Sequence, residues 1–229
     1  MSDYLRFLQE GFATVLEERA RHPDGGLSWP RALRSLLTGE SADGGDLRSG
    51  DRLVDFGCAS GYALRAFDDL DVSYLGIDLN PAYLAVGRAV FAGDPRVYFL
   101  EHDLMDTPPP VLAEVGLCSA LLETCPGLLP VLAHVAQCVT RMLVIRTHLG
   151  PAEEIHLPSP MLLYADGRPQ YANQYAVADL VRVLSDLDFA VTLLPDTVSG
   201  EQPVVVRDGF KPATVRTATT VLARKRTPV

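Results

Sequence analysis

The stretch Leu53-Val54-Asp55-Phe56-Gly57-Cys58-Ala59-Ser60-Gly61-Tyr62 has the pattern of a buried strand that runs through a tight turn into a helix. Residues 53–56 are apolar except for Asp55, which predicts a strand inside a sheet. Gly57 and Gly61 carry no Cβ, so the backbone N–H groups of the turn between them can approach a ligand closely. We therefore expect a ligand-binding turn at the end of this strand and a helix that starts near Tyr62.

Two further apolar runs end in acids. Residues 74–79 include Asp78, and residues 98–103 close on Asp103. Asp78 follows Gly57 by 21 residues (78 − 57), which is the usual reach of one strand–helix–strand unit to a pair of ribose hydroxyls. Three successive strands that deliver polar groups to one sheet edge predict a nucleoside-binding α/β domain.

The rest of the chain shows periodic apolar patterns broken by glycine and proline. Asn80 and Pro81 indicate a capped helix start directly after the second strand. A proline-rich segment at residues 151–169 predicts a long functional loop. Further helices are expected at residues 3–21, 29–37, 129–139 and 177–187, and further strands at 117–122, 142–146, 190–194 and 218–223.

With these motifs in this order, the chain resembles the class I S-adenosylmethionine-dependent methyltransferases over residues 50–226. The family has an acid two residues before its first glycine and acids at the ends of its second and third strands, matched by Asp55, Asp78 and Asp103. The family's loop often reads G-x-G-x-G, and Ala59 replaces the middle glycine here.

The resemblance implies an α/β, Rossmann-like, seven-stranded, mostly parallel sheet with a reversed last strand and helices on both faces. It divides the chain into an N-terminal helical cap, residues 1–49, and a methyltransferase domain, residues 50–229, with a lid insertion near 150–170. The cap is expected over the cofactor edge or the substrate mouth, or alternatively over an edge of the sheet.

The resemblance also implies which residues bind S-adenosyl-L-methionine and its product S-adenosyl-L-homocysteine. Asp55 would orient the loop or receive the ammonium group, Asp78 would accept from both ribose hydroxyls, and Asp103 would accept from the adenine amine. An acid at a strand end also serves as a helix cap or turn former, and that alternative stays open for each. The complete expected cofactor set is Asp55, Gly57, Cys58, Ala59, Ser60, Gly61, Asp78, Leu79, Asp103, Leu104, Met105 and Glu123.

Methyl transfer from a sulfonium depends largely on positioning, with a base only where the acceptor must lose a proton. The expected catalytic residues are His148, Glu123 and His156, each of which also has a purely structural alternative. Many relatives carry histidine after the acid at Glu123, where this chain has Thr124. The expected substrate contacts are Tyr171, Asn173 and Tyr175, although Asn173 is equally suited to cap the next helix.

Composition excludes several classes of function. A formal net charge of −9 and a pI near 5.0 argue against nucleic acid and anionic membrane as partners. The four cysteines have no metal-ligand spacing and the chain start has no signal-peptide pattern, so we expect reduced thiols in a cytoplasmic protein. A metal is not expected because the strand at 142–146 exits as Arg146-Thr147-His148, without a carboxylate. The amphipathic leading helix is compatible with a homodimer.

The leading hypothesis is methylation of a small-molecule acceptor. A hydroxyl oxygen is the preferred methyl acceptor, and nitrogen and carbon are the alternatives. Two lysines among many arginines, alanines and prolines indicate a GC-rich genome, for which secondary-metabolite or sugar biosynthesis is the expected setting. One alternative is a relative that keeps the cofactor but catalyses a non-methylating reaction such as cyclisation. A second is a nicotinamide-dependent oxidoreductase, which Asp55 and the Gly57-x-x-x-Gly61 spacing disfavour.

Overall fold

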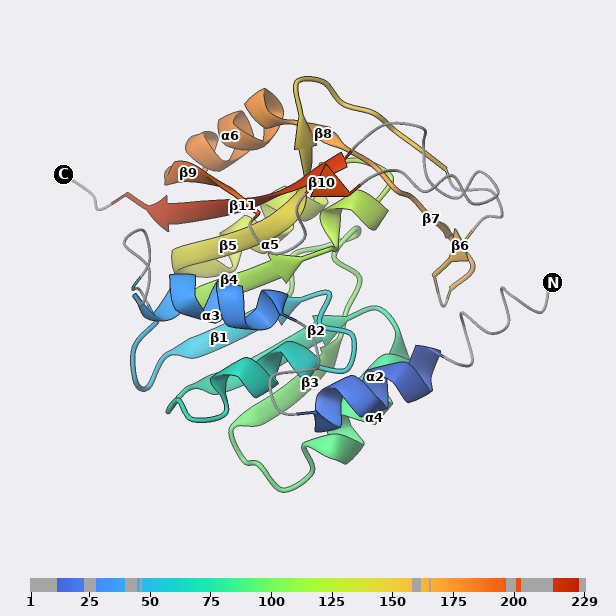
Figure 1. The fold of residues 1–229 in the computed structure, drawn as a ribbon, viewed down its shortest axis with the longest axis vertical. Coiled ribbons are helices and arrows are strands. Elements are labelled where there is room, and N and C mark those ends of the chain that lie inside the picture. Colours follow the sequence, from blue (N-terminus) through green and yellow to red (C-terminus); the bar gives the residue numbers. More distant parts are fainter. Residues whose placement is uncertain are drawn as a thin grey trace. The chain divides into compact units, whose positions relative to one another are not determined.

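The computed structural model describes residues 12–22, 28–39, 45, 47–157, 162–164, 166–196, 201–202 and 216–226. The chain forms two compact units, the first ending at His102 and the second starting at Asp103 (Figure 1). Three predicted features lie wholly or partly outside the described residues: the part of the helix at 3–21 that precedes residue 12, part of the lid, and most of the connection at 195–216.

The first unit contains a parallel sheet in which β2 lies between β1 and β3. These strands are β1 Arg52–Phe56, β2 Ser73–Asp78 and β3 Val97–Glu101. The register sets Asp55 opposite Gly76 and Asp78 opposite Glu101. All three strands were predicted, and because they are parallel their carboxyl ends meet at one edge.

The helices of the first unit surround the turn after β1. They are α2 Phe12–Arg21, α3 Trp29–Thr38, the 3₁₀ helix η3 Tyr62–Phe67 and α4 Pro81–Val90. The predicted cap of α4 is confirmed, because the Asn80 side chain accepts a hydrogen bond from Ala82 N at 3.0 Å. The helix expected at Tyr62 is a 3₁₀ helix of six residues. Helix α2 packs against α4 and η3, and α3 packs against η3 (Figure 1).

The second unit contains a mixed sheet. Strand β4, Ala113–Ser119, pairs in parallel with β5, Val139–Gly150. Strand β11, Arg216–Lys225, runs antiparallel to both of its main neighbours, β5 and β9 (Phe189–Pro195). The predicted reversal of the last strand is therefore confirmed. Two short strands pair with this sheet: β8 Tyr175–Ala176 with the end of β5, and β10 Glu201–Gln202 with β11.

Helices α5 Val131–Gln137 and α6 Val177–Asp186 belong to the second unit, and α6 packs against β9 and α5. A 3₁₀ turn, η4 Leu122–Thr124, follows β4. A small hairpin of β6 Leu162–Leu163 and β7 Pro169–Gln170 lies in the predicted lid segment. Strands and helices alternate along both units, as a Rossmann-like α/β fold requires.

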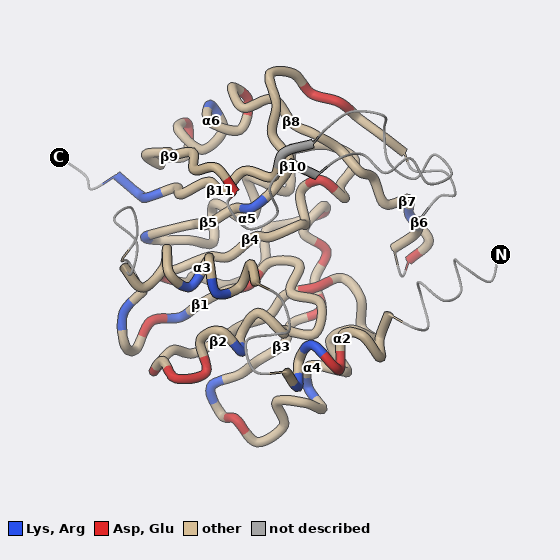
Figure 2. Tube along the Cα trace, viewed as in Figure 1, with Lys and Arg blue, Asp and Glu red and all other residues tan. Residues whose placement is uncertain are grey.

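Acidic and basic segments are interspersed along the described part of the chain, and basic residues follow one another only briefly, as at the end of β11 with Arg224 and Lys225 (Figure 2). None of the helices in the described ranges combines the length and the apolar character that a membrane-spanning segment needs.

Candidate functional site

The turn after β1 is built from left-handed backbone. Gly57, Ala59 and Gly61 have φ angles of 74°, 51° and 72°. For Ala59 this conformation costs about 1–2 kcal/mol, because its Cβ approaches the carbonyl oxygen that follows. Ala59 is the position where the resembled family usually has glycine, and the positive φ angle gives the physical reason for that preference.

The N–H groups of this turn serve its own structure. Gly57 N and Cys58 N both donate to Ile77 O, at 2.8 and 3.0 Å, and Ala59 N donates to Asp78 Oδ2 at 2.8 Å. The expectation that these donors point at a ligand is not met, because the end of β2 accepts all three. The turn is therefore fixed in place by β2.

Asp78 stands at the end of β2 with both oxygens engaged by backbone. Its Oδ1 accepts from Asn80 N at 2.8 Å, and its Oδ2 accepts from Ala59 N. Burial raises the pKa of Asp78, and the backbone hydrogen bonds from Asn80 and Ala59 oppose that rise. A carboxylate offers about four acceptor positions, so two remain for donors such as a ribose diol.

Asp55 lies inside the first unit beside Tyr74. The two side chains are buried, and the Tyr74 hydroxyl donates to Asp55 Oδ2 at 2.7 Å. Burial raises the pKa of Asp55 to about 7. The hydrogen bond from Tyr74 lowers this pKa, and the negative charge of Asp78 raises it further. Asp55 therefore changes its charge near neutral pH.

Contacts that the sequence did not reveal tie the leading helices to this turn. The buried Ser60 hydroxyl donates to Leu16 O at 3.0 Å, and Arg65 Nε donates to Ala20 O at 2.5 Å. Both acceptors lie on α2. The N-terminal helices thus support the turn and the 3₁₀ helix that follows it.

Asp103 is the first residue of the second unit, and a cation holds it. Its Oδ1 accepts from Met105 N at 2.8 Å, and its Oδ2 forms an ion pair with Arg168. Leu104 is buried and Met105 is half-buried. Arg168 was not among the expected site residues, although the neighbouring Asp166-Gly167 pair is a turn signal that predicts a hairpin.

Glu123 forms a partly buried contact with β5. Its Oε2 accepts from the Thr147 hydroxyl at 2.7 Å, and Thr147 is almost fully buried. Successive residues of a strand face opposite sides of the sheet, so His148 projects away from the face on which Thr147 meets Glu123. These two predicted catalytic residues are therefore not brought together through Thr147.

Asn173 instead links Glu123 with His156. Asn173 N donates to Glu123 O at 2.8 Å, and its side-chain oxygen accepts from His156 N at 2.8 Å. The Nε2 atom of His156 is enclosed and has no hydrogen-bond partner within the described ranges. Asn173 does not cap α6, where Ala176 is the cap, so that alternative is wrong.

In two of the three expected substrate residues, the polar side-chain groups donate hydrogen bonds to backbone carbonyl groups of the protein. Asn173 Nδ2 donates to Cys125 O at 2.8 Å, and the Tyr175 hydroxyl donates to Leu122 O at 2.9 Å. Both side chains are fully buried. Tyr171 is half-buried, and its backbone N–H donates to Thr124 O at 2.9 Å.

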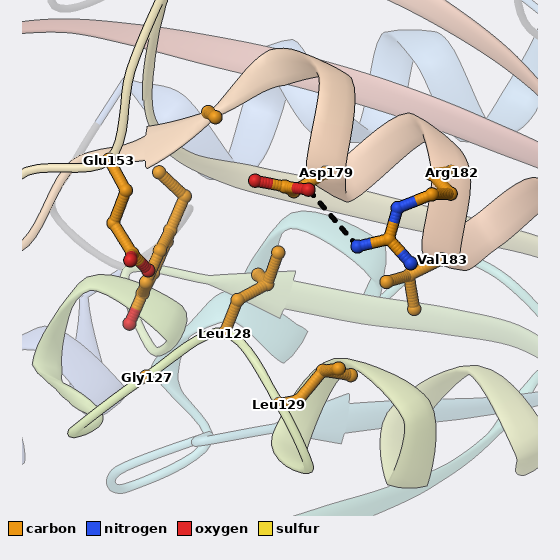
Figure 3. A pocket seen from close by; sticks show the side chains of 9 residues that line it. Gly127, Leu128, Leu129, Glu153, Asp179, Arg182 and Val183 are labelled. Atoms are coloured by element: carbon orange, nitrogen blue, oxygen red, sulfur yellow. Dashed lines mark hydrogen bonds and ion pairs between the residues drawn. The ribbon is translucent and has the colours of Figure 1, made fainter.

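A pocket of about 320 Å³ opens beside these residues, within the second unit. Its walls are the segment before α5, the first turns of α6 and Glu153 (Figure 3). Leu128, Leu129 and Val183 make it apolar, and the ion pair of Asp179 with Arg182 lies on one side (Figure 3). Among the residues that the structure describes, no three His, Cys, Asp or Glu side chains are arranged to hold a metal ion.

The sequence matches no family model and no curated protein. Several solved structures do match. The glycopeptide N-methyltransferase MtfA, complexed with S-adenosylmethionine, is 16% identical, with 90% of this chain and 98% of that chain covered and a TM-score of 0.60. The magnesium protoporphyrin IX methyltransferase ChlM from Synechocystis PCC 6803, with bound S-adenosylhomocysteine, is 16% identical. The match covers 86% of this chain and 83% of that chain, with a TM-score of 0.54.

The [4+2]-cyclase SpnF also matches, at 18% identity over 94% of this chain and 92% of that chain, with a TM-score of 0.61. At such identities the likeness shows a shared fold and nothing finer. The chain has the Rossmann-like fold of S-adenosylmethionine-dependent methyltransferases, and the predicted fold class is confirmed.

Proposed function

We propose that this protein transfers a methyl group from S-adenosylmethionine to a hydroxyl of a small-molecule acceptor, in secondary-metabolite or sugar biosynthesis. The observation that carries the proposal is Asp78 at the end of β2, held by Ala59 N and Asn80 N with acceptor capacity to spare. The fold supports the proposal as well, because similar structures hold S-adenosylmethionine or S-adenosylhomocysteine.

Each acid that follows a strand suits one part of the cofactor. In the proposal Asp78 accepts from the ribose hydroxyls, Asp103 accepts from the adenine amine, and Leu79, Leu104 and Met105 flank the ring. We assign Asp55, Glu123 and the turn at 57–61 to the methionine end, where the turn would contribute its shape, because three of its N–H groups donate to the end of β2. The cofactor supplies a methyl group that is activated by its sulfonium.

For the proton of the acceptor hydroxyl, we propose a histidine of the second unit as base. His156 is supported by its enclosed Nε2 without a hydrogen-bond partner within the described ranges and by its link through Asn173 to Glu123. His148 is supported by its place near the carboxyl end of β5. His156→Gln and His148→Gln distinguish the two candidates: the variant that lacks the base should lose most of kcat with cofactor affinity unchanged, and the other variant should keep the kcat of the wild type.

We further propose that the acceptor occupies the pocket formed by residues 127–129 and the start of α6. Its volume lies at the small end of ligand pockets, and residues that follow β4 and β5 in the chain contribute to its walls. Apolar walls with Glu153 and Arg182 at the side suit an acceptor with an apolar body and a polar substituent. Tyr171 directly follows β7, just after the predicted lid.

Calorimetric titration with S-adenosylmethionine and S-adenosylhomocysteine tests the cofactor. Wild type should bind both in the micromolar range, and Asp78→Asn should lose most of that affinity, since one or two hydrogen bonds to a charged acceptor are worth about 1.5–3 kcal/mol each. Asp186→Asn, an exposed acid on α6, is the matched control and should bind normally. Absence of binding by the wild type would refute the proposal.

A second candidate function is a non-methylating reaction such as cyclisation with the cofactor bound. Two observations favour it: Thr124 stands where many relatives have histidine, and the cyclase SpnF shares the fold. Consumption of the cofactor with the native acceptor distinguishes the two. Stoichiometric release of S-adenosylhomocysteine supports methyl transfer, and product without such release supports the second candidate.

A further inference from the structure

The hairpin of β6 and β7 is fastened at two points in the second unit. The Tyr164 hydroxyl lies 2.7 Å from Thr124 O and 2.8 Å from Thr124 Oγ1, just after β4. Arg168, on the other side of the turn, forms the ion pair with Asp103. A single short hairpin thus contacts the residues that follow β3 and β4 in the chain.

Arg168 is held by more than one partner. Its guanidinium also pairs with Asp166, with Nη2 2.6 Å from Asp166 Oδ2 and Nε 2.7 Å from the same oxygen. Its Nη1 lies 3.8 Å from the sulfur of Met105. Asp166 is in the same turn, so it fixes the direction in which the planar guanidinium points.

Asp103 is consequently held from both sides. Met105 N fixes Oδ1 and Arg168 fixes Oδ2, which leaves little rotation about the carboxylate. Each oxygen still has a free acceptor position, because a carboxylate offers about four in total. An amine donor can therefore bind Asp103 without displacing Arg168.

We propose that Arg168 is a positioning residue for adenine recognition, which orients the Asp103 carboxylate toward the exocyclic amine and fastens the β6–β7 hairpin beside the adenine site. The inference rests on the proposed function, in which Asp103 accepts from that amine. Arg168 contacts the acid and the side chain of Met105, the two kinds of group that recognise an adenine edge and face.

Removal of the guanidinium has two consequences. Asp103 keeps a single fixed oxygen, and the hairpin keeps the Tyr164 anchor alone. The partial exposure of Arg168 reduces what its ion pair contributes, so the expected effect is moderate. We expect Arg168→Met to weaken S-adenosylhomocysteine binding about 5- to 20-fold, mainly through faster dissociation. Arg168→Lys keeps the positive charge but loses the planar guanidinium with its paired donors, and it should weaken S-adenosylhomocysteine binding about 2- to 5-fold.

The test measures affinity and dissociation rate for S-adenosylhomocysteine and for its 6-oxo analogue, in which the amine is replaced by a carbonyl oxygen. The wild type should prefer the amine strongly, and Arg168→Met should lose most of that preference. Arg21→Met, which also breaks an exposed arginine–carboxylate pair, is the control and should behave as the wild type. If Arg168→Met does not fold, Arg168→Lys is measured in its place against the range given above.

Equal affinity and equal dissociation rate in wild type and variant would overturn this inference and leave the proposed function intact. The inference also fails if both proteins prefer the amine equally, because Arg168 would then act only on stability. If the wild type binds neither ligand, the proposed function and this inference fall together.

Discussion

Replacement of Asp55 with asparagine should stabilise the protein, and the gain should grow as the pH rises. Asp55 is buried beside Tyr74, and its pKa is raised from 3.8 to about 7. Between these two values the native protein holds a proton on Asp55 that the unfolded chain has released. Stability contributed by this group is therefore complete below pH 3.8 and falls until the pH passes about 7.

The size of the effect follows from the shift. One pKa unit corresponds to about 1.4 kcal/mol, so the wild type loses about 4 kcal/mol of unfolding free energy through Asp55 between acid and pH 8. About 3 kcal/mol of this loss falls between pH 5 and pH 8. Asparagine does not titrate and still accepts from the Tyr74 hydroxyl. The pKa of Asp78 is raised as well, but Asp78 is present in both proteins and its contribution largely cancels.

The assay is urea unfolding of wild type and Asp55→Asn at pH 5, 6, 7 and 8, followed by circular dichroism. The variant's advantage should be about 3 kcal/mol larger at pH 8 than at pH 5, with equal denaturant slopes. Asp186→Asn serves as the exposed control and should show a difference that stays near zero. A difference between variant and wild type that is constant across this range, or that shrinks as pH rises, would refute the reasoning.

Three further substitutions test other parts of the site. Ala59→Gly removes the cost of a positive φ angle, but glycine also gives the unfolded chain more freedom, so the net gain in stability should be less than about 1 kcal/mol. Ala59→Val should destabilise by more than about 2 kcal/mol in thermal unfolding, and equal effects of the two substitutions would contradict the left-handed turn. Thr147→Val leaves Glu123 without its buried donor and should lower the free energy of unfolding by about 1–3 kcal/mol, and an unchanged urea midpoint would show that this hydrogen bond contributes nothing. Leu129→Trp narrows the pocket and should raise KM for the acceptor severalfold while cofactor affinity stays constant, and an unchanged KM would place the acceptor elsewhere.

Much of the fold could be read from local patterns. Short apolar runs predicted β1, β2 and β3, and Asn80 with Pro81 predicted the start of α4. These features depend on residues that are close in sequence, so a single chain reveals them. The positions of Asp78 and Asp103 at strand ends followed from the same patterns.

The sequence also implied a glycine-type turn at 57–61, but the roles of its atoms depended on packing. The backbone donors of Gly57, Cys58 and Ala59 meet the end of β2, which lies about twenty residues further along the chain. Register between β1 and β2 decides that contact, and register is a property of the assembled sheet.

By itself, the sequence determined which acids stand at the ends of strands and that the chain builds an alternating α/β fold. Only the tertiary structure decided what holds each acid: Tyr74 for Asp55, Thr147 for Glu123 and Arg168 for Asp103, at separations of 19, 24 and 65 residues. Strand and helix periods are local and are written in neighbouring residues. The partner of a buried charge is chosen by how distant elements pack, and burial then sets whether that charge exists at neutral pH.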